Sequence, residues 1–170
     1  TCQFDLTPER DAPGNATLHF RFADTPGEVW IKALRFIDTV TGADVLPSGR
    51  FASEAAFQQC WSVWPQGAAN TVGTLAFTDN ALHVTLRAPA AGTARPDFHL
   101  YSRHLTFSKA RTYRCSFAVK AAPAQSVLPC VYRVDNGHYS RIGGPPGSFY
   151  TQIALARDAV TRAPALIAAL

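Results

Sequence analysis

Apolar and polar side chains alternate over several short stretches of this chain, and turn residues separate these stretches. In residues 16–22 and 81–87 every second side chain is apolar, which is typical of strands with one buried face. The apolar members are Leu18, Phe20, Phe22, Leu82, Val84 and Leu86. Strand patterns recur roughly every 10 to 15 residues, with Pro, Gly, Asn or Asp between them. This spacing predicts an all-β fold, a jelly-roll β-sandwich of two antiparallel sheets.

The same alternation predicts which side chains fill the space between the two sheets. A long strand is expected over residues 97–107, and further strands over 29–37, 112–119 and 127–134. The expected core comprises Leu18, Phe20, Leu82, Val84, Phe98, Leu100, Tyr113, Phe117 and Tyr132. Because successive side chains of a strand point to opposite faces, this assignment turns Asp97, His99 and Tyr101 away from the core.

Length and composition fit one sandwich followed by a helical tail. The chain has 170 residues, of which 47% are hydrophobic and 16% charged, enough for one core. The sandwich is expected over residues 1–148. Glycine and proline crowd residues 143–147, and helix-forming residues follow before Pro164. Residues 149–170 are therefore expected to form a short C-terminal helix, which could also be the start of a downstream catalytic domain.

The distribution of charge and the start of the sequence give expectations about nucleic-acid binding, membrane spans and the cellular compartment. The net charge is +4, but the arginines are scattered, and no run of about five like charges marks a nucleic-acid surface. No apolar run of about 18 residues predicts a membrane span. The sequence begins at Thr1 and contains no Met. We therefore expect a module cut from a larger exported protein, secreted or periplasmic, whose export signal lies upstream or was removed.

The four cysteines, Cys2, Cys60, Cys115 and Cys130, form no C-x-x-C motif. Cys115 and Cys130 lie in two strand-like segments whose intervening turn centres near residue 123. If the chain folds back there, these two cysteines lie almost opposite each other on neighbouring strands, within reach of a disulfide. The alternative is a pair of buried free thiols that pack as small hydrophobic side chains.

Several stretches resemble carbohydrate-active proteins. Residues 17–36, which include Pro26-Gly-Glu-Val-Trp-Ile31, resemble the last two strands of a family 4/9-type carbohydrate-binding module. Residues 81–86 and 111–121 resemble that family's middle strands, and residues 149–159 are similar to the opening helix of a TIM-barrel hydrolase. The resemblance implies a galactose-binding-like jelly roll that binds a polysaccharide or oligosaccharide. It also implies a tethered catalytic domain, that of a bacterial glycoside hydrolase.

The order of these stretches departs from that family, because its final strands come first here. Either residues 1–46 end one module and residues 47–148 start another, or one sandwich is completed in permuted order, which leaves fewer open sheet edges. The positions that match the family's calcium ligands are Ala52 and Lys32-Ala33, which supply no carboxylate oxygen. No metal or other cofactor is therefore expected.

Polar faces of the expected strands supply the candidate glycan-binding residues. They are Asp97, His99 and Tyr101 on one strand, His83 and Arg87 on a second, and Arg114 on a third. Aromatic rings offer sugars an apolar stacking surface, and Asp, His and Arg side chains form hydrogen bonds with hydroxyls. Trp61 and Trp64 are further candidates: we expect one in the core and the other on a loop as a sugar platform.

Three functions remain open at this point. The first is a non-catalytic carbohydrate-binding or accessory module of a larger glycan-degrading enzyme. The second is a structural spacer whose polar sheet face is only solvated. The third is a small jelly-roll polysaccharide lyase, in which His99, Tyr101 and an arginine would serve as acid and base groups.

Overall fold

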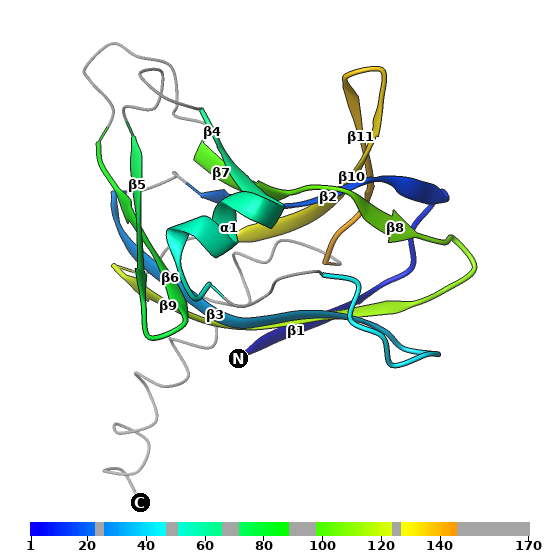
Figure 1. Cartoon of the computed structure of the whole chain (residues 1–170), viewed down its shortest axis with the longest axis horizontal. Helices are drawn as coiled ribbons and strands as arrows, with labels where there is room; N and C mark the ends of the chain where they lie inside the picture. Colours follow the sequence, from blue (N-terminus) through cyan, green and yellow to red (C-terminus); the bar gives the residue numbers. More distant parts are fainter. Residues whose placement is uncertain (23–25, 47–50, 66–71, 89–97, 124–126, 146–170) are drawn as a thin grey trace, which may run out of the picture.

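The computed structural model describes residues 1–22, 26–46, 51–65, 72–88, 98–123 and 127–145. These residues form two antiparallel sheets that pack face to face (Figure 1). The first sheet has five strands in the order β1 (Cys2–Leu6), β9 (Tyr113–Ala122), β3 (Gly27–Asp38), β6 (Ala81–Leu86) and β5 (Gly73–Thr78). The second sheet has the order β11 (His138–Gly143), β10 (Leu128–Asp135), β2 (Ala12–Phe22), β7 (Phe98–Ser102) and β4 (Trp61–Trp64), and β8 (Leu105–Phe107) also pairs with β2. The expected β-sandwich of two antiparallel sheets is confirmed.

The core lies between the two sheets and is rich in aromatic rings. Phe20 of the second sheet and Phe117 of the first are both fully buried, and their ring centroids lie 5.2 Å apart. Of the nine side chains expected in the core, eight are buried: Leu18, Phe20, Leu82, Val84, Phe98, Leu100, Tyr113 and Phe117. The alternation located them because a strand with one buried face must place every second side chain inside.

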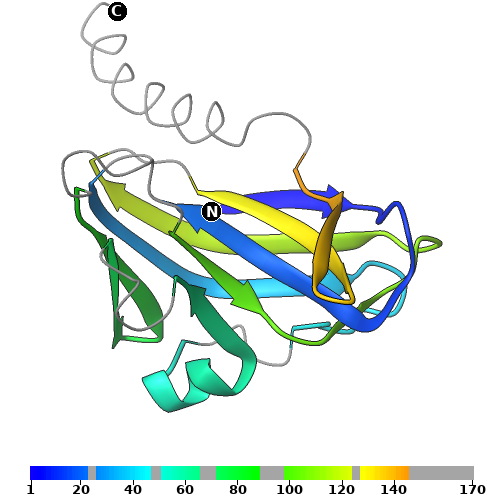
Figure 2. The same ribbon diagram turned by 90° about the horizontal axis from the view of Figure 1, so that it is seen from above.

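Two strands from residues 1–46, β2 and β3, occupy inner positions of the two sheets, whereas β1 lies at an edge of the first sheet (Figure 2). β2 lies between β10 and β7, and β3 lies between β9 and β6. The short helix α1 (Glu54–Cys60) lies at the side of the sandwich where β4 and β5 end the two sheets (Figure 1). The Ser53 side chain caps this helix by accepting a hydrogen bond from the Ala56 N–H.

Tyr132 is the expected core residue that the structure places elsewhere. In β10 the inward side chain is Val131, which is fully buried, and Tyr132 lies on the outer face of the second sheet. The segment 127–132 is apolar at nearly every position. Such a run contains no alternation from which the inward face can be assigned, and the inferred face was the wrong one.

The segment expected as one strand over residues 97–107 forms two, β7 and β8. The backbone leaves the extended region at His104, whose φ is 57°. Asp97, the boundary near residue 148 and the expected helix over residues 149–170 lie outside the described residues.

Cys115 and Cys130 do not lie on neighbouring strands. Cys115 is in β9 of the first sheet and Cys130 is in β10 of the second, and all four cysteines are free. The connection between β9 and β10 crosses from one sheet to the other, so the predicted hairpin and its disulfide are wrong, and the structure has the alternative of two buried free thiols. Burial raises the pKa of both thiols, which therefore remain protonated at neutral pH.

The Asp38 carboxylate holds the turn that follows β3. It accepts hydrogen bonds from the Arg111 guanidinium and from the backbone N–H groups of Val40 and Thr41. The bond from Arg111 lowers the pKa of Asp38 to about 2 against the opposing effect of burial, and the two backbone N–H groups add to the lowering.

We expect the stabilising contribution of the Asp38 carboxylate to be lost as the pH falls from about 4 to about 2, because the carboxylate is then protonated. Its pKa is lower in the folded state than in the unfolded state, so the stabilisation present above the unfolded-state value is lost in this window. Asp38→Asn should reduce the slope of unfolding free energy against pH there, as measured by urea unfolding. Asp79→Asn, in an exposed turn, is the matched control and should keep the wild-type slope. A wild-type slope in Asp38→Asn would contradict the assignment.

Candidate functional site

A hollow of about 330 Å³ lies on the outer face of the second sheet. Its described lining residues are His19, Arg21, Trp64, His99, Tyr101, Tyr132 and Tyr139. We call this hollow the aromatic trough. It combines four phenol or indole rings with two imidazoles and one guanidinium, and no described carboxylate lines it.

Strand pairing brings these side chains to one place. His19 of β2 lies opposite Tyr101 of β7, and Arg21 lies opposite His99. Trp64 of β4 lies opposite His99 on the other side of β7. Directly opposed residues of antiparallel strands point to the same face, so three strands present their polar faces together. The trough is therefore a consequence of register, since these residues are far apart in sequence.

His19 forms the floor of the trough. Its ring centroid lies 5.0 Å from that of His99 in a stacked arrangement, 5.6 Å from that of Tyr101 and 4.6 Å from that of Tyr132. The side chain is only 6% exposed, and its Nε2 lies 2.8 Å from the Thr17 hydroxyl. A ring that is enclosed and hydrogen-bonded in this way supports its neighbours and is poorly placed to exchange a proton with a bound ligand.

Trp64 and Tyr139 form the walls. Their side chains are 52% and 54% exposed, which is unusual for large apolar side chains in this structure. In Figure 1, β4 and the β10–β11 hairpin rise from the second sheet on either side of β7 and β2. Rings at the two sides and a floor of rings give a ligand apolar surfaces to pack against.

The expected site residues fall into three groups. Trp64, His99 and Tyr101 line the trough. Trp61 is 1% exposed and packs in the core against Phe51, so it is not a sugar platform. As predicted, one tryptophan lies in the core and the other is exposed, but the exposed Trp64 lies on strand β4 and not on a loop.

The remaining candidates lie on the outer face or edge of the first sheet, away from the trough. His83 of β6 stacks on Trp30, with ring centroids 4.6 Å apart. Arg114 of β9 forms a two-fold ion pair with Asp5, at 2.8 Å for each of its two hydrogen bonds. Arg87 follows β6 and is exposed. His83, Arg87 and Arg114 therefore do not join His99 and Tyr101 in one site, because β6 and β9 belong to the opposite layer.

Four residues of the trough were not among the predicted site residues: His19, Arg21, Tyr132 and Tyr139. His19 and Arg21 alternate with the apolar residues of their strand and so lie on its polar face, but the pairing of that strand with β7 cannot be obtained from local pattern. Tyr132 was assigned to the core, and Tyr139 lies in β11, for which no strand was expected. The concentration of Tyr132, His138 and Tyr139 around one turn was the available signal.

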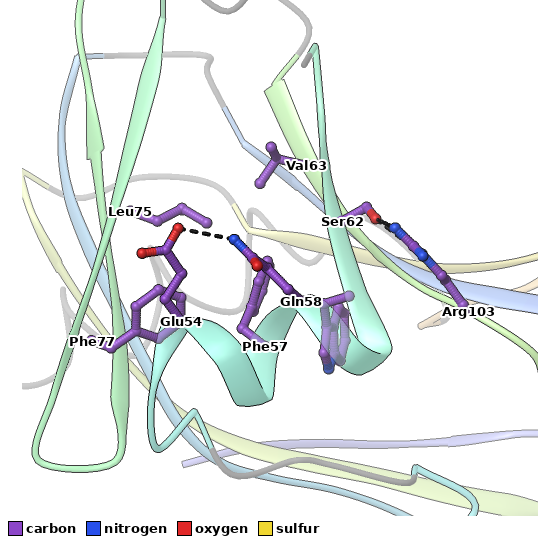
Figure 3. Close-up of a pocket in the computed structure, with 9 residues that line it drawn as sticks. Glu54, Phe57, Gln58, Ser62, Val63, Leu75, Phe77 and Arg103 are labelled. Carbon is purple, nitrogen blue, oxygen red and sulfur yellow. Dashed lines mark hydrogen bonds between the residues drawn. The ribbon is translucent and has the colours of Figure 1, made fainter. Parts of the chain in front are cut away.

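A second hollow, of about 290 Å³, lies beside α1 between β4 and β5 (Figure 3). Its polar groups are paired with one another: Gln58 donates to Glu54 over 3.0 Å, and the Arg103 guanidinium donates to the Ser62 hydroxyl. The other lining side chains, such as Phe57 and Phe77, close the side of the core. This hollow has fewer groups available to a polar ligand than the aromatic trough.

Other classes of site gain no support in the part of the chain that the structure describes. No group of three or more His, Cys, Asp or Glu side chains is arranged to hold a metal ion among these residues. The described helix is also too short to cross a membrane. We found no match to this chain among protein-family models, curated proteins or solved structures.

Proposed function

We propose that this chain is a non-catalytic carbohydrate-binding module that holds a polysaccharide or oligosaccharide in the aromatic trough. The supporting observation is the convergence of Trp64, Tyr101, Tyr132 and Tyr139 on one open hollow. Sugar rings present apolar C–H faces that pack against aromatic rings, and their hydroxyls exchange hydrogen bonds with imidazole, phenol and guanidinium groups. His99, Arg21 and the tyrosine hydroxyls provide such groups beside the rings.

The expected affinity is modest. Each ring contact contributes on the order of 1 kcal/mol, and each hydrogen bond contributes a similar net amount. A few such contacts correspond to a dissociation constant in the micromolar to millimolar range. Tethering to a catalytic domain would raise the effective concentration of the module at the glycan surface. We therefore propose an accessory role within a larger, secreted or periplasmic glycan-degrading enzyme. The proposed fold family is the galactose-binding-like jelly roll, which several stretches of the sequence resemble.

A polysaccharide lyase is the second candidate, because His99, Tyr101 and Arg21 line the same hollow. Elimination needs a base near the proton, an acid near the leaving oxygen and a cation near the carboxylate. The residue types are present, but the predominance of aromatic side chains in the trough favours binding. A spacer without ligand is the third candidate.

Tyr101→Ala tests the proposal. Titration of the wild type with a panel of soluble oligosaccharides by calorimetry should show binding, and the variant should bind several-fold more weakly. Its melting temperature should stay near that of the wild type, because a ring on the outer face leaves no cavity in the core. Arg114→Ala, on the first sheet, is the control and should keep full affinity.

Three outcomes would contradict the proposal. Equal binding by the wild type and Tyr101→Ala would exclude the trough as the site. No binding across the panel would favour the spacer. Release of unsaturated products from uronate polymers, detected by their ultraviolet absorbance, would establish a lyase.

A further inference from the structure

The outer face of the first sheet carries a separate hollow of about 470 Å³. The residues that line it include Trp30, Lys32, Thr78, Asp79, Ala81, Ala118 and Lys120. We call it the Trp30 hollow. It lies on the opposite layer of the sandwich from the aromatic trough, and the two share no residue.

Strand register explains why this face is hollow. Lys32 of β3 lies opposite Ala81 of β6 on one side and opposite Ala118 of β9 on the other. In the next row across the same strands, Trp30 lies between His83 and Lys120. The small side chains of Ala81 and Ala118 thus lie next to the large side chains of the Trp30 row. This difference in size leaves a depression with the Trp30 indole as its wall.

The Trp30 ring is held in one orientation. The His83 ring stacks on it at 4.6 Å with an angle of 9° between the planes, and the Lys120 ammonium lies 4.9 Å from its centroid. The Glu28 carboxylate lies 3.5 Å from Nε2 of His83. A wall that is supported by both neighbouring strands loses little conformational freedom when a ligand packs against it.

The charges around the hollow are of both signs. Among the described residues neither Lys32 nor Lys120 makes an ion pair, whereas Arg35 and Arg114 of the same face are paired with Asp44 and Asp5. Asp79 lies in the turn between β5 and β6, where it and Asn80 both have positive φ, 52° and 57°. This two-residue turn is of the type that joins antiparallel strands tightly, so it fixes the backbone from which the Asp79 side chain extends.

We propose that the Trp30 hollow is a second binding site, for an acidic sugar residue of the hexuronate class. The ligand carboxylate would lie between the ammonium groups of Lys32 and Lys120, and a hydroxyl would donate to the Asp79 carboxylate. The apolar face of the sugar would pack on Ala81, Ala118 and the indole edge. A simple anion gains nothing from Asp79 or the apolar floor, and a neutral sugar gains nothing from the two lysines.

Nuclear magnetic resonance of the ¹⁵N-labelled protein can follow ligand binding at the two hollows separately, because each hollow contains one tryptophan. The measured quantities are the chemical shifts of the indole N–H signals of Trp30 and Trp64. Trp30→Phe and Trp64→Phe assign these signals. On titration with a galacturonic acid trimer at neutral pH, the Trp30 signal should shift and saturate. Maltotriose, as the neutral trisaccharide, should shift it much less, and so should sodium sulfate at matched ionic strength. The proposed function is read from the Trp64 signal, so its failure is distinguishable from a failure here.

Lysine variants test the contacts. Lys32→Gln should weaken the trimer affinity measured at Trp30 about threefold or more, and the double variant with Lys120→Gln about tenfold. Lys109→Gln removes the same charge from an exposed turn and should leave this affinity within about twofold. Melting temperatures should confirm that all three variants fold.

Some results would overturn the inference. One is a Trp30 signal that does not move at saturating trimer. Another is an equal loss of affinity in Lys32→Gln and Lys109→Gln, which would reveal general charge attraction. A shift with sulfate as large as that with the trimer would show an anion site without sugar recognition.

Discussion

Trp61→Ala is expected to lower the free energy of unfolding by about 3–5 kcal/mol, the usual range for removing a buried aromatic ring. Trp61 is 1% exposed, and its ring contacts those of Phe20 and Phe51 at 6.2 and 5.8 Å between centroids. Truncation would open a cavity among rings on several elements, which cannot all move inward to fill it. Domains of this size are stable by roughly 5–15 kcal/mol, so the substitution should remove a large part of the total free energy of unfolding.

Trp64→Ala is the matched control three positions along the chain, and it should change the unfolding free energy by less than about 0.5–1 kcal/mol. Its indole is 52% exposed on the outer face of the second sheet and leaves no core cavity. Urea unfolding followed by circular dichroism measures both variants on one scale. A Trp61→Ala variant as stable as the wild type, or a strongly destabilised Trp64→Ala variant, would show that the two rings were assigned to the wrong sides.

Loss of both walls of the aromatic trough should reduce oligosaccharide affinity by roughly 30-fold, if each ring contributes about 1 kcal/mol and the two act independently. Trp64 and Tyr139 lie on β4 and β11, at the two edges of the second sheet. The double variant Trp64→Ala/Tyr139→Ala removes both rings and leaves the floor of His19, His99 and Tyr101 in place. Calorimetric titration with the tightest ligand of the panel gives the ratio of affinities.

Val40→Ala provides the control for this experiment. Val40 is 77% exposed and apolar, and it lies in the turn after β3, outside the trough. This substitution should leave the affinity unchanged. Wild-type affinity in the double variant would place the glycan elsewhere on the surface, and a drop of equal size in Val40→Ala would show that the loss is not specific to the trough.

The two proposed sites use the two outer faces of one sandwich. Neutral and acidic sugars would then be bound through different chemistry: stacking dominates in the trough, and charge is added at the Trp30 hollow. A branched or mixed polymer could contact both faces only if it wraps around the edge of the sheets. Separate neighbouring chains could occupy them without that constraint.

Local pattern was sufficient for most strands and for the burial of their side chains. Residues 16–22 and 82–86 alternate clearly, and the apolar side chains of these two ranges are buried in the structure. The same rule placed His99 and Tyr101 on the outer face, where they line the trough. It failed at Tyr132, since the apolar run of residues 127–132 has two apolar faces. One of them packs in the core, and the other supports the trough.

The amino-acid sequence by itself therefore determined the all-β class, the positions of most strands and the outward direction of His99 and Tyr101. These properties depend on a period of two residues, which is set by the pleat of a single strand. Only the tertiary structure decided that His19 lies beside Tyr101, that Trp64 lies beside His99, and that Cys115 and Cys130 belong to different sheets. Strand order and register depend on the packing of all strands around one core, and residues distant in sequence become neighbours only when that packing is complete.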